Sequence, residues 1–131
     1  MCPFAIALRI LAIAFIATAS LHLMFGLYAD ANPTNPGFIS IVTVLEIVWV
    51  LRSLLKQTPL EIAKHLEHLL AADSLHIQNE QQVFEATFAL KRGIGEFEDA
   101  LIGALNHWAG CPHTLTFDKR ALRMSYFQLI T

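Results

Sequence analysis

The sequence is short of charge, of cysteine and, in its first part, of acidic residues. Asp, Glu, Lys and Arg make up 15% of the 131 residues and the formal net charge is -2, so no basic field surrounds the molecule to attract nucleic acid. Cys2 and Cys111 are its two cysteines and form no CxxC or metal-type motif, which indicates reduced thiols rather than a disulfide framework. Contact with nucleic acid would therefore depend on local basic clusters.

The N-terminal segment lacks acids altogether and carries little positive charge. Ile10–Ala29 contains no charged side chain, and about 20 apolar residues are long enough for one membrane span. Arg9, this apolar run and the small residues Ala17–Ala19 are also compatible with a signal peptide. We favour a third interpretation, in which the segment forms a buried strand and a buried helix of an intracellular domain.

A chain of 131 residues is long enough for one domain, here residues 1–131, and too short for two of ordinary size. The 55% hydrophobic content favours an α/β domain whose parallel sheet is covered by helices on both faces. We expect strands at Phe4–Leu8, Phe38–Ile41, Leu75–Gln78, Thr114–Phe117 and Phe127–Ile130, and helices at Ala12–Ala29, Thr43–Lys56, from Pro59, at Glu80–Lys91 and at Phe97–Trp108. Among the apolar positions on expected helical stripes are Leu60, Leu66, Phe97, Leu101 and Trp108, and the expected helix Glu80–Lys91 has Val83, Phe84 and Phe88 partly facing inward.

Glu46 is the one charged residue in the apolar stretch Phe38–Leu51. A carboxylate among Ile, Val and Trp side chains is costly to desolvate unless a cation, a metal ion or strong hydrogen-bond donors meet it. Glu46 is therefore the first candidate metal ligand. Its alternative role is structural, because Thr43 and Glu46 have the spacing of a capping box at the start of a helix.

Asp99 and Asp118 are two further candidate ligands. Asp99, with Glu96 as a supporting acid, follows Gly95 in the first turn of an expected helix, and Asp118 ends an expected strand. Strand carboxyl ends and helix amino ends converge at one edge of an α/β sheet, so we expect these acids and Glu46 to form one cluster. Each also has an ordinary explanation, because acids complement the dipole at a helix start and Asp is common in turns.

Three separated blocks carry a family resemblance: Phe38–Ser53, Phe97–Gly103 and Leu115–Lys119. They resemble the PIN-domain ribonuclease toxins of bacterial toxin-antitoxin pairs, the VapC type, over residues 38–130, whereas residues 1–37 diverge. The resemblance implies a PIN-like fold, a cytoplasmic location, RNA as the substrate and a protein antitoxin as the partner. A homodimer is a further option, and membrane attachment is the less favoured one.

In that family four acids bind Mg²⁺ or Mn²⁺, and three of them have counterparts here. Glu46 matches the glutamate of the helix after the second strand, and Asp99 matches an aspartate that opens a later helix. Asp118 matches the aspartate of a Thr-x-Asp strand end. The resemblance thus implies that these three acids are the metal-binding and catalytic residues. In an intact site, substrate contacts would come from Thr116, Lys119 and Arg120.

The family's first acid, in an Asp-Thr-Asn-like motif that closes the first strand, has no counterpart. Its expected place holds Phe4–Leu11, and Arg9 would bring a cation near the carboxylates if this segment forms the central strand. We therefore expect weak or absent RNA cleavage, with a catalytically inactive binding module as the alternative function. The abrupt loss of resemblance before Phe38 points to a shifted reading frame or displaced start as one origin of the segment.

Other polar clusters have weaker signals. Lys91–Arg92 and Lys119–Arg123 are basic, and for each an ordinary solvated surface is as good an explanation as a phosphate contact. His65 and His68 lie three residues apart on an expected helix, but no third residue with zinc-ligand spacing accompanies them.

Overall fold

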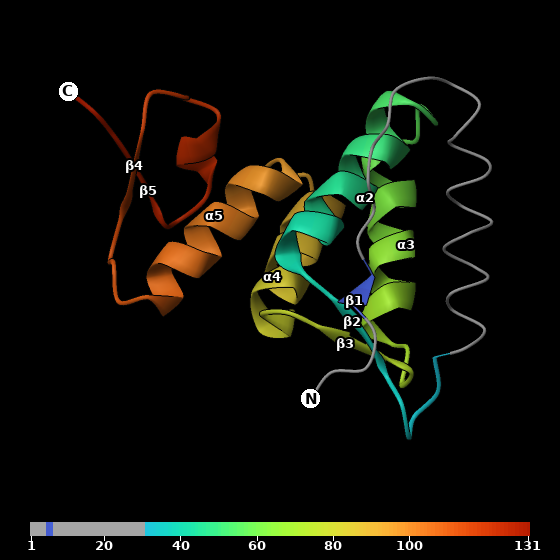
Figure 1. Ribbon diagram of the computed structural model, residues 1–131. Helices are drawn as coiled ribbons and strands as arrows, with labels where there is room; N and C mark the ends of the chain where they lie inside the picture. Colours follow the sequence, from blue (N-terminus) through green and yellow to red (C-terminus); the bar gives the residue numbers. More distant parts are fainter. Residues whose placement is uncertain (1–4, 7–30) are drawn as a thin grey trace.

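Four α-helices and several short parallel strands make up the part of the chain that the computed structural model describes, residues 5–6 and 31–131 (Figure 1). In chain order the elements are β1 (Ala5–Ile6), β2 (Gly37–Ile39), α2 (Ile41–Ser53), α3 (Pro59–Leu70), β3 (Leu75–Ile77), α4 (Glu80–Lys91), α5 (Phe97–Trp108), β4 (Thr114–Thr116), the 3-10 helix η1 (Ala121–Arg123) and β5 (Phe127–Leu129). This is the α/β class that the alternation of segments predicted.

The described strands form two small parallel sheets. In the first, β2 lies between β1 and β3, with Ala5 opposite Phe38 and Phe38 opposite His76. In the second, β4 pairs with β5, and Thr114 is opposite Phe127. Figure 1 shows this pair beyond α5, away from the three-stranded sheet. We expected one sheet, but β4 and β5 pack beside α5 instead of extending the first sheet.

Most expectations for the N-terminal segment fall outside the described residues. The pairing of Ala5–Ile6 with β2 confirms part of the expected first strand. The rest of that strand, Arg9, Cys2, the expected helix Ala12–Ala29 and both membrane-related interpretations of Ile10–Ala29 lie outside the described ranges. Within those ranges, no helix is long and apolar enough to cross a membrane.

Ser40, rather than Thr43, is the N-cap of α2. Ser40 has an extended backbone after β2, and its side-chain oxygen accepts a hydrogen bond from the Thr43 backbone N–H at 3.2 Å. Thr43 is buried inside the helix, so the predicted capping box between Thr43 and Glu46 is wrong. The helix also ends before the predicted Lys56, whose φ of 53° is outside the right-handed helical region.

The start of α3 is closed by a capping box that involves Thr58 and Glu61. The Thr58 hydroxyl accepts from the Glu61 backbone N–H at 3.4 Å, and the Glu61 carboxylate accepts from the Thr58 backbone N–H at 2.8 Å. The Thr58 backbone N–H and the Thr58 hydroxyl both donate to the Glu61 carboxylate, and these two hydrogen bonds lower the pKa of Glu61. Pro59 occupies the first turn of the helix, as predicted.

Apolar side chains from all four described helices and from the first sheet form the core. Helix α4 packs against both α3 and α5 and so connects the two halves of the described chain. The bulkiest fully buried side chains include Phe97, Ile62, Leu66 and Leu101. Phe97 starts α5, and its complete burial anchors the first turn of that helix in the core.

Four apolar positions on the predicted helical stripes or partly inward faces are exposed. Leu60, Phe84, Phe88 and Trp108 have 49%, 53%, 50% and 73% of their surface exposed. Helical periodicity identifies an apolar stripe, but it does not say which neighbouring element covers that stripe. Leu60 and Trp108 lie at helix ends, and the Phe88 ring carries the Arg92 guanidinium 5.5 Å from its centroid.

Close packing on α5 positions the second sheet. Gly103 of α5 leaves room for Phe127 of β5, since a Cβ at this position would lie 2.8 Å from the Phe127 ring. The His107 ring stacks on Tyr126 with 4.5 Å between the ring centroids. These contacts attach β5, and with it the paired strand β4 that leads to Asp118, to the helix that carries the other candidate aspartate.

Candidate functional site

Asp99 lies in the first turn of α5, whose N-cap is Glu96. Burial raises the pKa of the Asp99 carboxyl, and the negative charges of Asp118, Glu98 and Glu96 raise it further, while Arg120 lowers it. Asp118 acts on Asp99 across a long stretch of sequence because β4 packs beside α5. The fold therefore brings these two candidate ligands close enough for one charge to act on the other.

Asp118 follows β4 in a turn that its own side chain closes. Its backbone N–H donates to Thr116 Oγ1 at 3.0 Å, and its Oδ1 accepts from the backbone N–H of Arg120 at 2.8 Å. The Arg120 guanidinium also donates, with Nη2 at 3.1 Å from Asp118 Oδ2. These side-chain and backbone hydrogen bonds from Arg120 hold the pKa of Asp118 below its usual range. Thr116 thus orients the candidate ligand.

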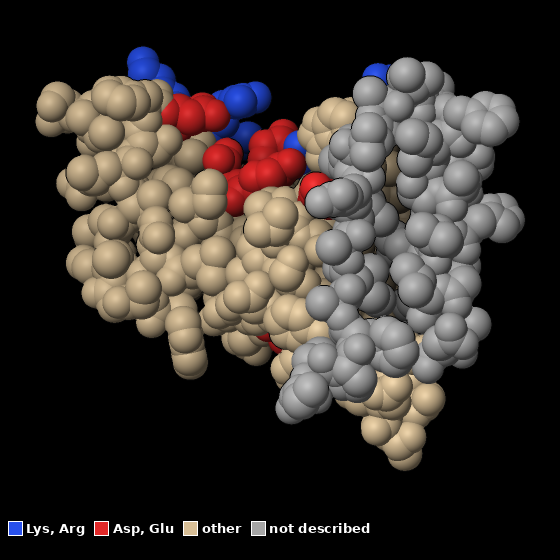
Figure 2. All heavy atoms as spheres, in the orientation of Figure 1, with Lys and Arg blue, Asp and Glu red and all other residues tan. Residues whose placement is uncertain are grey.

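A small hollow of about 30 Å³ lies where the start of α5 meets η1, and Glu96, Asp99, Arg120 and Arg123 are among its lining residues. Figure 2 shows acidic side chains gathered in a hollow of this face, with Lys and Arg side chains above them. The hydrogen bond to Asp118 raises the pKa of Arg120, and the charges of Asp118, Glu96 and Asp99 add to this effect. Arg120 is therefore a cation that three acids share.

Arg52 connects the last turn of α2 to the first turn of α5. Its Nη1 and Nη2 donate to the two carboxylate oxygens of Glu98 at 2.9 and 3.0 Å, and Nη2 lies 3.5 Å from Glu96 Oε2. A two-bond guanidinium–carboxylate pair of this kind fixes orientation as well as charge. Sequence analysis missed it, because the partners are far apart in the chain and the acids of the first turn had a sufficient local explanation in the helix dipole.

Glu46 is half-buried rather than enclosed by apolar side chains. Residues three or four apart share a helix face, and the neighbours of Glu46 on its face include Val42 and Trp49, which are 65% and 45% exposed. The expectation of an enclosed carboxylate is therefore wrong, because the helix directs adjacent residues to different sides. Among the described residues no hydrogen bond or ion pair joins Glu46 to Asp99 or Asp118, and its place in their cluster stays a prediction.

The candidate phosphate contacts differ in their surroundings. Lys119 is exposed and follows Asp118 directly. In the other basic cluster, Lys91 Nζ pairs with Glu67 Oε1 at 2.6 Å, and Arg92 packs over the Phe88 ring. Lys91 and Arg92 thus have structural partners in the fold.

The weaker metal-site candidates gain no support. His65 and His68 are both exposed on α3, and Cys111 is a free, exposed cysteine. In the described part of the chain, no group of three or more His, Cys, Asp and Glu side chains has the arrangement of a metal site. Asp99 and Asp118 form a pair rather than such a group.

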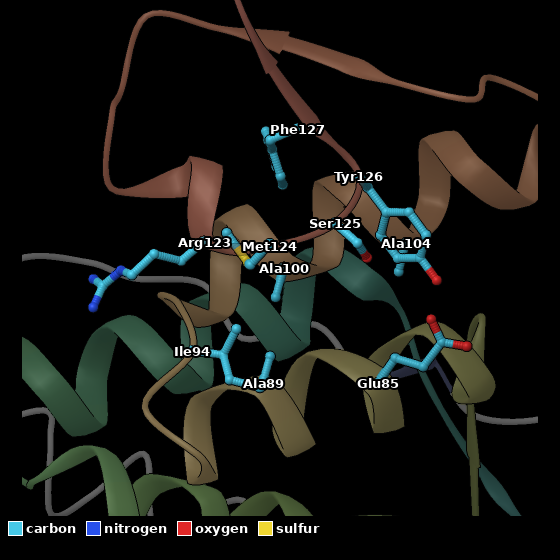
Figure 3. A pocket seen from close by; sticks show the side chains of 10 residues that line it. All are labelled: Glu85, Ala89, Ile94, Ala100, Ala104, Arg123, Met124, Ser125, Tyr126 and Phe127. Atoms are coloured by element: carbon cyan, nitrogen blue, oxygen red, sulfur yellow. The ribbon is translucent and has the colours of Figure 1, made fainter.

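A larger cleft of about 280 Å³ adjoins the acidic hollow, since Arg123 and Met124 line both. Figure 3 shows this cleft between α4, α5 and the chain that leads into β5, with Glu85 and Tyr126 toward one end and Arg123 at the other. Its middle is mainly apolar and includes Ala100 and Met124. The face therefore combines a small acidic hollow with an apolar cleft.

No match to this chain is found among protein-family models, curated proteins or solved structures. Asp99 and Asp118 offer only carboxylate oxygens, which are the ligands that hard divalent cations prefer. The neighbouring arginines offer donors for anionic groups such as phosphate.

Proposed function

We propose that this protein is a metal-dependent endoribonuclease toxin of the PIN type, acting on RNA in the cytoplasm. In this proposal Glu46, Asp99 and Asp118 are the ligands of Mg²⁺ or Mn²⁺ and the catalytic residues, within a PIN-like sheet covered by helices. The cleavage activity is weak, because the sequence has no counterpart of the family's first acid.

The effect of the Asp118 charge on the Asp99 carboxyl, which adds to that of burial, is the observation that supports this proposal. The charge of Asp118 raises the pKa of Asp99, which is a repulsion that a divalent cation between them would turn into attraction. Mg²⁺ is commonly bound by one or two carboxylates while it keeps several waters. A carboxylate pair therefore fits a hard cation, with Glu46 as the proposed third acid.

The surrounding side chains have distinct proposed tasks. A bound ion would supply an activated water and charge stabilisation at the scissile phosphodiester. Thr116 holds the Asp118 backbone through its hydroxyl and so keeps the carboxylate in place. Arg120, which lines the hollow, and Lys119, the exposed residue before it in the sequence, would contact substrate phosphate.

The proposed partners fit the same face. An antitoxin with a cationic segment would complement the acidic hollow, and its apolar residues would find the adjoining cleft. A homodimer is proposed through α4, where Phe84 and Phe88 are about half exposed one helical turn apart.

A catalytically inactive binding module is the second candidate function, and a specific observation favours it. Asp118 is neutralised by Arg120, and Glu98 by Arg52, without any metal. Arginines of the chain itself thus neutralise part of the acidic face. In this candidate function the face still binds an antitoxin, although catalysis is lost. Divalent-ion binding without Mg²⁺-dependent RNA cleavage would favour this candidate over a working nuclease.

Isothermal titration of the full chain with Mn²⁺ tests the metal site. We expect the wild type to bind, Asp99→Asn and Asp118→Asn to lose at least about tenfold in affinity, and Glu46→Gln to weaken binding as well. Asp73→Asn, which changes an exposed acid in the turn between α3 and β3, is the matched control and should bind like the wild type. Wild-type affinity in both Asp99→Asn and Asp118→Asn would contradict the proposal.

A further inference from the structure

Two glycines let side chains near the C-terminus pack closely and so build one wall of the apolar cleft. A Cβ at Gly95, just before α5, would lie 2.5 Å from Met124 Sδ, and a Cβ at Gly103 would lie 2.8 Å from the Phe127 ring. Met124 and Phe127 both line the cleft, and Met124 is buried. This wall is fixed by the packing of the fold, so the cleft exists before any ligand binds.

The two ends of the cleft carry opposite charges. Figure 3 shows Arg123 at one end and Glu85, with Tyr126, toward the other. The side chains between them are mainly apolar and include Ile94 and Ala100. A ligand that fills the cleft therefore meets a cation, then an apolar surface and then a carboxylate.

Arg123 is held differently from the other two arginines of this face. Arg52 pairs with Glu98, and Arg120 pairs with Asp118. Arg123 donates from Nε to the Arg120 carbonyl oxygen at 3.3 Å, and within the described ranges it forms no ion pair with an acid. Hydrogen bonds from Arg120 are the main cause of the lowered pKa of Asp118, and the Arg123 charge adds to it without a bond. The Nη donors of Arg123 are therefore available to an anionic group.

Glu85 is the corresponding acid without a cation. It is half-buried on α4, and its Oε1 accepts one long hydrogen bond from Gln81 Nε2 at 3.3 Å. No Lys, Arg or His in the described part of the chain forms an ion pair with it. Partial burial reduces the hydration of a carboxylate, so a cationic group that reaches Glu85 gains more than it would at a fully exposed acid.

We propose that the cleft binds a small organic zwitterion with an apolar body, whose anionic group bonds Arg123 and whose cationic group bonds Glu85. The volume of about 280 Å³ lies just below the roughly 300–1,000 Å³ of pockets for drug-sized ligands, so it suits a narrow molecule. The two charges favour such a ligand over a fatty acid or an alkylamine, because either of those leaves one charge of the cleft unpaired. The inference goes beyond the proposed function and needs no metal ion.

An ion pair at each end also sets the length of the ligand. This favours a free small molecule over a segment of a peptide, since a peptide chain continues beyond both of its charged side chains. Apolar residues of the proposed antitoxin would use the same cleft, so a bound ligand and the antitoxin would exclude each other.

Calorimetric titration of the full chain with ω-aminohexanoate, ω-aminooctanoate and ω-aminododecanoate tests the inference. We expect one of these lengths to bind best. The fatty acid and the alkylamine of that same length each lack one charged end, and each should bind about two- to fivefold more weakly, the range for loss of one exposed ion pair. The end-blocked peptides Glu-Leu-Leu-Lys and Lys-Leu-Leu-Glu carry the same groups on a peptide chain and should bind more weakly still.

Two variants assign each end of the ligand to its residue. Arg123→Gln should weaken binding of the ω-amino acid and the fatty acid but leave the alkylamine unchanged, whereas Glu85→Gln should weaken the ω-amino acid and the alkylamine. Arg92→Gln and Glu80→Gln are the matched controls, because neither residue lines the cleft, and both should bind like the wild type. Thermal unfolding verifies that each variant is folded.

The comparison of probes on the wild type needs no variant, so it decides the question even where a variant does not fold. Preference for an ω-amino acid over both of its single-ended analogues, lost at the assigned end in each variant, supports the inference. Equal binding of the three probes of one length shows apolar association only and overturns it. Binding by a peptide without binding by any ω-amino acid, or no binding at all, overturns it as well.

Discussion

Asp99 and Asp118 are chemically identical, yet their surroundings move their pKa values in opposite directions. Burial and neighbouring acids raise that of Asp99, although the helix dipole at the start of α5 favours a carboxylate there. Hydrogen bonds from Arg120 lower that of Asp118. Asp118 thus stabilises the fold at neutral pH and loses this contribution as the pH falls through its lowered value, whereas ionised Asp99 opposes folding.

Replacing Asp99 by Asn should stabilise the metal-free protein at pH 7. An acid with a raised pKa in the folded state contributes stability below the unfolded value of about 4, and this contribution is lost as the pH rises through the folded value. Asn cannot ionise and avoids that loss, so we expect a gain of less than about 1 kcal/mol after screening by water and salt.

Urea unfolding in EDTA at pH 4 and pH 7 measures this effect. Asp99→Asn should gain over the wild type at pH 7 and show little gain at pH 4. The exposed Asp73→Asn serves as the control, with no comparable difference between the two pH values. A loss of stability in Asp99→Asn at pH 7 would mean that the carboxylate is favourable in the fold, which contradicts the repulsion inferred from its neighbours.

Sequence reasoning identified the two aspartates but not their cations. Asp118 follows a strand and Asp99 lies at a helix start, and parallel α/β topology predicts that such places converge. Arg120 was expected as a substrate contact within a basic cluster and not as the partner of Asp118, because that contact depends on the turn that Asp118 itself closes. Glu46 illustrates the reverse error, since an apolar run in sequence does not enclose a residue once the run becomes a helix.

The helices show which features local sequence patterns predict correctly. α4 and α5 have the predicted bounds, Glu80–Lys91 and Phe97–Trp108. The predicted start of α2 was wrong because Ser40 and Thr43 are both residue types that cap helices well. Ser40 is the N-cap because its backbone is still extended after β2. Which helix faces are buried depends on neighbouring elements, and this explains the unexpected exposure of Phe84 and Phe88.

The contact between α2 and α5 has a coupling energy that can be measured. The two-bond pair of Arg52 with Glu98 is partly buried, so a double-mutant cycle with Ala should give a coupling of about 1 kcal/mol. The single bond between Lys91 and Glu67 is the matched comparison, with an expected coupling of about 0.5 kcal/mol or less. Urea unfolding of the single and double variants measures both, and equal couplings would show that Arg52 does not fix the start of α5.

For the molecule as a whole, composition and alternation predicted the α/β class but not the division into two sheets. The sequence pattern of a strand does not specify which other strand pairs with it. Here β4 and β5 pair with each other beside α5, where Gly103 leaves room for the Phe127 ring. This arrangement suffices to bring Asp118 near Asp99. The central claim is thus a spatial one: the carboxylates of Asp99 and Asp118 lie close enough together to share one divalent ion.

A crystal structure of the full chain soaked in Mn²⁺, with the anomalous signal of the ion, tests that claim most directly. We predict one strong peak bonded to carboxylate oxygens of both Asp99 and Asp118 at about 2.0–2.2 Å, near the distances typical of hard cations. A map without a peak between these two carboxylates at saturating Mn²⁺, or with side chains too far apart to share one ion, would contradict it.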